Sequence, residues 1–164
     1  MLNKHLTVNL QKPKEWVKAS CGFGVAFLFV VFISNNLKFL ISETDSLPCH
    51  YFLHFPKIKP GLHDYTVIES SWYQGKIIKQ IVGRSGDEIW QDKNGHIFVN
   101  QLNIGNALKI SSDGKALTPI KSQTIPQGYV FLCSDHARSF DSRYEELGLV
   151  PLSSLEGLVV PLSR

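Results

Sequence analysis

The chain has 164 residues, of which 43% are hydrophobic and 19% charged, with a formal net charge of +3 at pH 7. This length supports one domain, and about 120 residues beyond an N-terminal segment suffice for one compact core. The excess charge belongs to the N-terminal tail: residues 1–18 hold four lysines and one glutamate, whereas residues 19–164 hold 13 basic and 13 acidic side chains. This balance gives no support for a nucleic-acid-binding surface.

An uncharged run, Ala19 to Ile33, follows the tail, and apolar character resumes after three polar residues. Because a membrane-spanning helix needs about 20 mainly apolar residues, we expect a retained transmembrane anchor over residues 19–41. The lysines of the cytoplasmic basic tail, residues 1–18, then place residues 42–164 on the far side of the membrane. A cleaved signal peptide, for which no A-x-A-like site stands out, and a buried helix of a soluble protein stay open as alternatives.

Residues 42–164 have the pattern of a compact all-β domain, because short β-branched and aromatic runs alternate with Gly, Pro, Asn and Asp. Asp92-Lys93-Asn94-Gly95 predicts a hairpin turn. We expect residues 92–124 to leave the core sheet, with the polar stretch Asn106–Ser122 facing solvent, and a helical turn at Pro151–Leu155. The expected strands are Tyr51–Phe55, Tyr65–Glu69, Lys76–Val82, Glu88–Gln91, His96–Val99, Leu102–Ile104, Tyr129–Leu132 and Gly157–Pro161.

The three cysteines are Cys21, Cys49 and Cys133. If the predicted topology is right, Cys49 and Cys133 face an oxidising compartment, where a disulfide between them and two unpaired buried thiols are both open. Their spacing fits no zinc motif.

Ser46 lies in a short polar segment and is followed by Leu47-Pro48. Proline restricts the residue before it to extended geometry, so the turn is stiff, as the position of a nucleophile must be. A plain polar turn after the apolar segment is the alternative interpretation.

Lys79 lies in an expected strand, where alternate residues share a face, so its side chain points the same way as those of Ile77 and Ile81. Burial among isoleucines lowers a lysine pKa because the ammonium loses hydration, and a neutral amine is a competent general base. An edge-strand lysine whose ammonium reaches water is the alternative.

The segment Ser134–Tyr144 concentrates polar side chains. Asp141 and Arg143 are close enough to form an ion pair that pins a loop, and Ser139 could then hydrogen-bond the Lys79 amine. A structural polar turn is the alternative. His136 would suit a Ser-His-Asp triad, but nothing near it in the sequence positions the imidazole. The remaining histidines show no metal-ligand spacing, which concerns His50, His54, His63 and His96.

Taken in chain order, these segments resemble the type I signal peptidases, the membrane-anchored serine–lysine leader peptidases. The resemblance rests on Ser46-Leu47-Pro48, Gly61–Asp64, Ile78–Gly83, Gly86-Asp87 and Ser139-Phe140-Asp141-Ser142-Arg143. It is closest to the subgroup that processes pilin precursors for conjugative DNA transfer. Departures from the family pattern are Ser85 in place of proline, Cys49-His50-Tyr51 after Ser-Leu-Pro, and Glu145-Glu146-Leu147 before Gly148.

The resemblance implies that Ser46 is the nucleophile and Lys79 the general base, with the lysine oriented by the Ser139 hydroxyl. It assigns Thr44 to the oxyanion hole and Asp141 with Arg143 to the support of the loop. It gives the substrate-binding positions to Leu47, which would line the pocket before the cut, and to Lys76, Ile77 and Ile78, which would pair with an extended substrate.

The resemblance also implies a mainly β signal-peptidase-type domain after an N-terminal transmembrane helix, in the bacterial inner membrane with the catalytic domain periplasmic. The expected function is a serine endopeptidase that removes leader peptides from exported precursors, a pilin or another conjugative-transfer protein. The partners are a membrane-tethered precursor and the lipid bilayer, with no nucleic acid, and no metal or other cofactor is needed. A non-catalytic anchored assembly factor and a pilin-cyclising transpeptidase are the alternatives.

Overall fold

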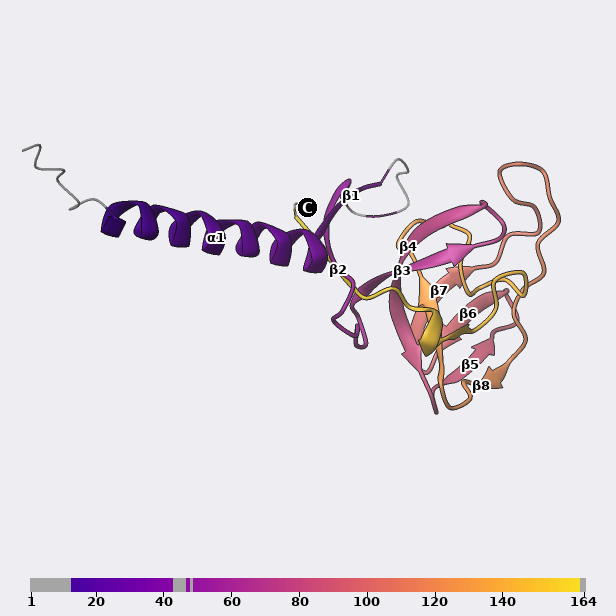
Figure 1. Cartoon of the computed structure of the whole chain (residues 1–164). Coiled ribbons are helices and arrows are strands. Elements are labelled where there is room, and N and C mark those ends of the chain that lie inside the picture. Colours follow the sequence, from indigo (N-terminus) through magenta and orange to yellow (C-terminus); the bar gives the residue numbers. More distant parts are fainter. Residues whose placement is uncertain (1–12, 43–46, 48, 163–164) are drawn as a thin grey trace, which may run out of the picture. The chain divides into compact units, whose positions relative to one another are not determined.

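The computed structural model describes residues 13–42, 47 and 49–162, and its contacts divide the chain into two units, Met1–Asn36 and Leu37–Arg164. The first unit contains one described helix, α1 (Pro13–Asn36), and the second is built almost entirely of strands (Figure 1). Proline suits the first position of a helix because its ring fixes a helical φ and no intrahelical N–H bond is lost there.

Helix α1 ends earlier than the anchor predicted over residues 19–41. The Ser34 hydroxyl donates to Val31 O at 3.0 Å and the Asn36 amide donates to Phe32 O at 2.6 Å. Such side chains compete for the carbonyls of the last turn. Beyond them, Lys38–Ile41 form strand β1, so the predicted end of the apolar helix is corrected to Asn36. Among the described residues, no helix is both long and apolar enough to cross a membrane.

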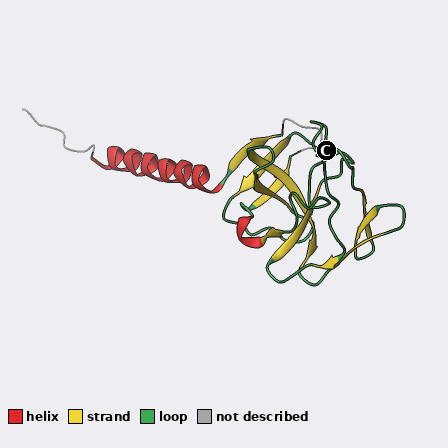
Figure 2. Cartoon of the chain, turned by 90° about the vertical axis from the view of Figure 1, so that its right-hand side faces the viewer, coloured by secondary structure: helices red, strands yellow, loops and turns green. Residues whose placement is uncertain are grey.

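Within the described residues, the strands of the second unit form two antiparallel sheets (Figure 2). The larger sheet has the order β1-β2-β11-β3-β4-β9-β10, and the smaller has the order β7-β6-β5-β8. The bounds in the larger sheet are β1 (Lys38–Ile41), β2 (Tyr51–Phe55), β11 (Leu158–Pro161), β3 (Tyr65–Ser70), β4 (Gly75–Arg84), β9 (Tyr129–Cys133) and β10 (Val150–Pro151). The bounds in the smaller sheet are β7 (Leu102–Asn106), β6 (His96–Val99), β5 (Glu88–Gln91) and β8 (Gln123–Thr124).

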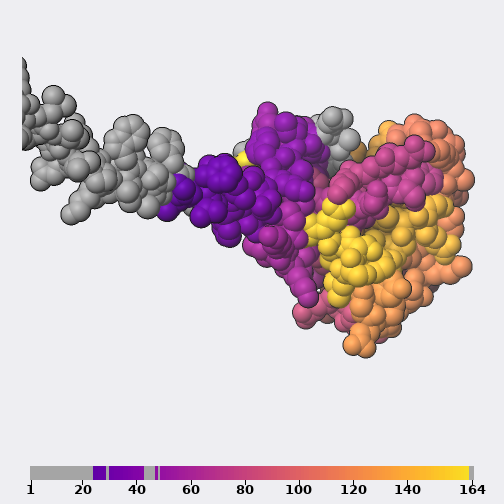
Figure 3. Space-filling model, viewed as in Figure 1, coloured from indigo at the N-terminus to yellow at the C-terminus, as the bar shows by residue number. Residues whose placement is uncertain are grey.

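The C-terminal strand β11 closes the larger sheet between two strands from the start of the domain. It pairs with β2 through Leu158↔Phe55 and with β3 through Leu158↔Thr66. In the space-filling view, the yellow C-terminal residues lie between the purple and magenta segments (Figure 3). The C-terminal strand of the domain is therefore hydrogen-bonded on both edges to strands near its N-terminal end.

Strand β9 is buried on both faces and joins the two sheets. Its Phe131 and Cys133 pack in a cluster with residues of the smaller sheet, such as Ile97, whereas Val130 and Leu132 pack with residues of β3 and β4. Because successive residues of a strand face opposite sides, one strand contributes to both clusters. Burial on both faces fixes the register of β9, so the chain leaves this strand at a defined point of the sheet.

The eight strands expected from the sequence are present, with ends shifted by up to two residues. The described strands that the pattern missed are β1, β8 and β10, and the expected turn near residue 152 is a 3-10 helix, η1 (Leu152–Ser154). The departure from the larger sheet, expected over residues 92–124, begins earlier, because β5 already belongs to the smaller sheet. Leu117 and Ile120, in the stretch expected to face solvent, are buried. That expectation was wrong there because isolated apolar residues in a polar stretch carry no period.

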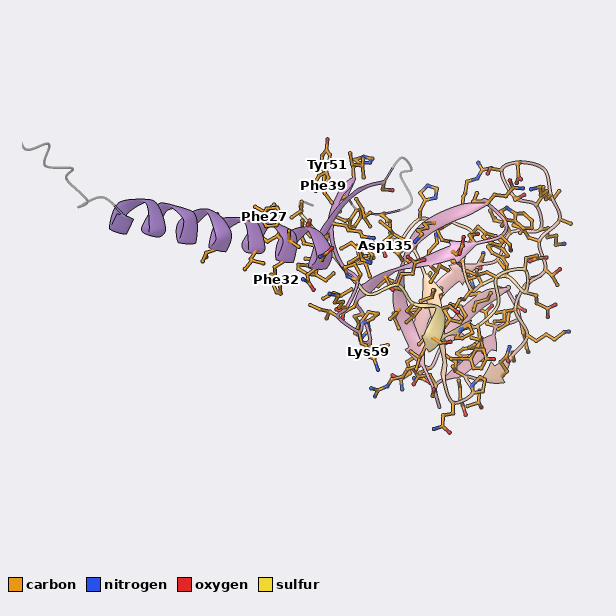
Figure 4. The ribbon with its side chains drawn as sticks, in the orientation of Figure 1. Phe27, Phe32, Phe39, Tyr51, Lys59 and Asp135 are labelled. Atoms are coloured by element: carbon orange, nitrogen blue, oxygen red, sulfur yellow. The ribbon has the colours of Figure 1, made fainter. Side chains whose placement is uncertain are left out.

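The β1–β2 pair carries exposed aromatic side chains. Phe39 and Tyr51 stack with ring centroids 5.9 Å apart and lie side by side, as Figure 4 shows. Both are about half exposed, and Ile41 on the same strand is 63% exposed.

Gly157, just before β11, meets the backbone of the turn after β2. Its φ is +92°, and a Cβ there would lie 2.7 Å from Pro56 Cα and closer still to Phe55 O. Gly157→Ala should lower the free energy of unfolding by about 2–4 kcal/mol, combining a left-handed conformation with overpacking. Gly86→Ala is the matched control, because Gly86 has the same φ in open space, and it should cost about 1–2 kcal/mol. Urea unfolding measures both, and equal losses would contradict the steric argument.

Candidate active site

Lys79 is a buried lysine in the middle of β4. Its side chain is 4% exposed, and its Nζ donates to Ser139 Oγ at 2.6 Å and to Ser134 Oγ at 2.8 Å. It shares its face of the strand with Ile77 and Ile81, which pack in the cluster formed by β3, β4 and β9. The amine is thus held between two hydroxyls rather than in water.

Burial lowers the pKa of Lys79 from 10.5 to about 8, because the ammonium loses hydration. Asp141 and Cys133 act in the opposite direction and raise this pKa, whereas Arg143 lowers it. A pKa near 8 leaves a usable fraction of neutral amine at neutral pH, which is the protonation state that a general base requires.

Behind the lysine lies a buried ion pair between Asp141 and Arg143, whose side chains are 0% and 1% exposed. It is bidentate: Arg143 Nε donates to Asp141 Oδ1 at 2.8 Å and Nη2 donates to Oδ2 at 2.9 Å. Hydrogen bonds to the carboxylate raise the pKa of Arg143, although burial alone acts to lower it. Planar, two-point pairing is the geometry in which a buried ion pair is best satisfied.

Arg143 also fixes the loop that carries Ser139. Its Nη2 donates to the carbonyls of Ser139 at 3.1 Å and His136 at 3.2 Å, and its Nη1 donates to Ala137 O at 3.2 Å and Asn106 O at 3.3 Å. The loop is therefore wrapped around one guanidinium, which positions the Ser139 hydroxyl at the amine.

Aromatic stacking supports the same loop from the other side. Phe140 stacks on Trp72 with centroids 4.7 Å apart and on Tyr144 at 6.0 Å, and the edge of Tyr73 meets it at 5.9 Å. Trp72 and Tyr73 come from the turn between β3 and β4, so this stack ties the turn to the loop. Each such pair adds about 0.5–1.5 kcal/mol beyond the buried area.

A cleft of about 800 Å³ opens beside the lysine. It brings together Leu47, Lys76, Ile77, Ile78, Lys79 and Ser139, all predicted site residues, with side chains to which the sequence analysis gave no role in the site. The latter are Ile41, Ser42, Tyr73, Ser112, His136, Arg138 and Phe140.

One edge of β4 is open beside the cleft. Ile81 N donates to Asp64 O and Ile81 O accepts from His63 N, so the backbone of Ile81 faces the β3 side. Alternation then turns the N–H and C=O of Ile78 to the opposite side. Strand β9 pairs with β4 on that side only from Gln80 onward, and no other described strand pairs there. An extended peptide could add to this edge.

Asp141 and Arg143 do not line the cleft but lie behind its wall. Ser46 and Thr44, predicted as nucleophile and oxyanion residue, lie outside the described residues. Leu47, which follows Ser46 in the chain, is buried and packs with Phe52 and Val67.

Ser134 is the functional candidate that the sequence missed, since its hydroxyl matters only through its contact with Lys79. Cys49 and Cys133 are free, buried thiols, which answers the open question of a disulfide. Burial raises the pKa of Cys133 to about 12, so this thiol is no nucleophile at neutral pH. In the described part of the chain, no group of three or more His, Cys, Asp or Glu side chains is placed to hold a metal ion.

Comparison with known proteins gives concordant matches. The family "Signal peptidase, peptidase S26" matches residues 14–162. "Conjugal transfer protein TraF" of Agrobacterium fabrum is 30% identical over 91 residues, 56% of this chain and 50% of that protein. The protein of the same name in Agrobacterium tumefaciens is 31% identical over 86 residues, 52% of this chain and 48% of that protein.

The chain thus spans about half the length of these curated relatives. A solved signal peptidase I from Enterococcus faecalis is 23% identical with a TM-score of 0.42, over 61% of this chain and 96% of that one. The family match extends over nearly the whole chain, from the second residue of α1 to just beyond β11. On that match, this chain belongs to the signal peptidase family, peptidase S26.

Proposed function

We propose that this protein is a serine endopeptidase in which Ser46 attacks the peptide bond and Lys79 acts as general base. The observation that carries the proposal is the buried amine of Lys79, held by two hydroxyls at the wall of a cleft. Ser42 and Leu47, which flank the segment containing Ser46, both line that cleft. Family membership supports the same reaction.

In the proposed reaction, neutral Lys79 takes the hydroxyl proton of Ser46 as Ser46 Oγ bonds to the substrate carbonyl carbon. The Thr44 hydroxyl and the Ser46 N–H stabilise the resulting oxyanion. Lys79 then returns the proton to the leaving amine, and an acyl-enzyme forms. Water, deprotonated by the same lysine, attacks the acyl carbon, and Lys79 gives that proton to Ser46 Oγ as the ester bond breaks and the acid is released.

The substrate class is inferred from the open edge of β4 and from the relatives. We propose an extended segment of an exported precursor that pairs with the backbone of Ile78, with a small side chain directed toward Leu47. The relatives named as conjugal transfer proteins favour a precursor from a conjugation apparatus, such as a pilin.

Cleavage of such a precursor tests the proposal. Ser46→Ala and Lys79→Ala should each lower kcat/KM by at least about a thousandfold, because nucleophile and base act as a unit. Lys59→Ala removes an exposed lysine that does not line the cleft, and it should retain full activity. N-terminal sequencing and intact mass of the products provide the measurement. Full activity of the Ser46 or Lys79 variant would refute the mechanism, and a conjugation role without any processing would favour an assembly factor.

The buried amine should also cost stability. A lysine whose pKa falls from 10.5 to about 8 on folding opposes folding by roughly 3 kcal/mol below pH 8, where the amine is protonated in both states. Lys79→Met should therefore raise the free energy of unfolding by about 1–3 kcal/mol at pH 7, after the loss of two hydrogen bonds.

The sign of the pH dependence is set by the lowered pKa. Below pH 8 the amine is protonated in both states and the folded chain bears the full penalty. Between pH 8 and 10.5 the folded amine is already neutral while the unfolded chain still binds a proton, so the penalty falls with each pH unit and is gone above 10.5. The advantage of Lys79→Met should thus shrink as pH rises from 8 to 10.5, whereas Lys59→Met should show no such trend. Denaturant unfolding at several pH values measures this, and a constant difference would argue against a neutral Lys79.

We further propose that the apolar run from residue 19 to 33 tethers the protein to the bacterial inner membrane, with the catalytic domain periplasmic. The run is uncharged and follows a basic tail, and Val25, Leu28 and Val30 in it are more than 60% exposed. The full chain should stay with membranes after an alkaline carbonate wash, and Leu28→Lys with Val31→Lys should release it. Release of the unaltered chain by carbonate would contradict a membrane tether.

A further inference from the structure

Ser134 is the first residue after β9, and its hydroxyl accepts from Lys79 Nζ at 2.8 Å. It is buried, and its backbone N–H donates to Asp141 Oδ2 at 3.4 Å. The hydroxyl therefore contacts the amine directly, at an ordinary hydrogen-bond distance.

The register of the larger sheet explains this contact. β4 and β9 pair through Ile81↔Leu132 and Gln80↔Cys133, and one further step along the two chains sets Lys79 opposite Ser134. Directly opposite residues of an antiparallel pair have Cβ atoms about 4.5–5.5 Å apart. The side chains of Lys79 and Ser134 meet because they lie one position beyond Gln80↔Cys133, the last pair of the β4–β9 ladder.

The contact with Ser134 completes the hydrogen bonding of the neutral Lys79 amine. A neutral lysine amine has two N–H groups and one lone pair, and the two N–H groups of Lys79 have Ser134 and Ser139 as acceptors. Ser139 lines the cleft with Lys79, whereas Ser134 does not. With one acceptor at the wall and one behind it, the remaining tetrahedral position of the nitrogen is left for the cleft.

We propose that Ser134 is a second positioning residue for Lys79, which acts with Ser139 to direct the lone pair of the amine toward the nucleophile. This inference rests on the proposed peptidase function. A single acceptor would leave the amine free to rotate about its Cε–Nζ bond, whereas two acceptors fix that rotation.

The ion pair behind the site sets the separation of the two serines. Asp141 holds the backbone of Ser134, and Arg143 holds the carbonyl of Ser139 at 3.1 Å. Because Asp141 and Arg143 bind each other in two places, the two acceptor hydroxyls are parts of one rigid arrangement. The same ion pair thereby helps to position both serines.

The activity test is the pH profile of kcat/KM for Ser134→Ala. The wild-type profile should rise with pH through an apparent pKa near 8, as Lys79 loses its proton. Removal of an acceptor destabilises the ammonium more than the amine, so the apparent pKa should fall by about 1. Asp141, Cys133 and Arg143, the other groups that influence this pKa, are unchanged in the variant. kcat should fall about 10- to 100-fold with little change in KM.

Ser142→Ala is the matched control. Ser142 is a buried serine of the same loop, but its hydroxyl accepts from the backbone N–H of Leu132 at 3.0 Å and does not contact Lys79. Its loss should lower the melting temperature and leave the apparent pKa unchanged. Ser134→Thr, which keeps the hydroxyl, should restore the apparent pKa of the wild type. A Ser134→Ala profile with the wild-type pKa and kcat would overturn the proposal.

A second readout is independent of activity. In the Ser46→Ala chain, the ¹³Cε signal of Lys79, assigned by its loss in a Lys79→Arg variant, reports the protonation of the amine directly. Added Ser134→Ala should lower the titration midpoint of this signal, and added Ser142→Ala should not. An unchanged midpoint would refute the role of Ser134, even if the chain cleaves precursors. A lowered midpoint in a chain without cleavage activity would refute the peptidase function alone.

Discussion

The buried ion pair between Asp141 and Arg143 determines the geometry on which the rest of the site depends. Both side chains are buried away from water, and an unpaired charge in such a place would cost much free energy. That cost is offset because the guanidinium and the carboxylate form two hydrogen bonds with each other and the remaining guanidinium N–H groups donate to backbone carbonyls. The pair also has an electrostatic consequence. Asp141 raises the pKa of Lys79 and Arg143 lowers it, so their opposing effects leave burial as the dominant influence. A lone carboxylate at that position would favour the ammonium form of Lys79.

Strand β4 can pair with β3, expose a free backbone edge and present the Lys79 side chain, because these roles involve different edges and faces of the strand. Residues facing β3 hold the strand in the sheet, Ile78 presents backbone groups to the open edge, and the side chain of Lys79 reaches the loop after β9. These purposes are compatible because β9 stops pairing at Cys133. Beyond Cys133 the chain turns into the loop that Asp141 and Arg143 hold. The same departure opens the edge of β4 and brings a serine hydroxyl to the lysine.

The sequence was sufficient to predict the strands whose own residues alternate between apolar and polar. It was insufficient to predict strands and contacts that exist only because another strand pairs with them. Eight strands were predictable from alternation, and the burial of Lys79 followed from its isoleucine neighbours in β4. Strand β1 was hidden in an apolar run, because such a run has no period that separates strand from helix. Strands β8 and β10 have two residues each and exist through pairing alone. Ser134 could not be found without the β4–β9 register, whereas Ser139 was proposed from the polar segment Ser134–Tyr144 and then from the family resemblance.

The segment between β7 and β8, which was expected to face solvent, is tied to the loop after β9 by Tyr144 and by Glu146, and Glu146 is one of the residues at which the chain departs from the family pattern. The carboxylate of Glu146 accepts from Thr118 N at 2.9 Å, and the Tyr144 hydroxyl accepts from Leu108 N at 3.2 Å. Ser112 of the same segment lines the cleft. The extra residues after Tyr144 therefore do not disturb the loop that carries Ser139. They fasten to it a segment that reaches the cleft, so chain-specific residues contribute to the surface that a substrate would meet while the ion pair keeps the lysine and its two serines in place.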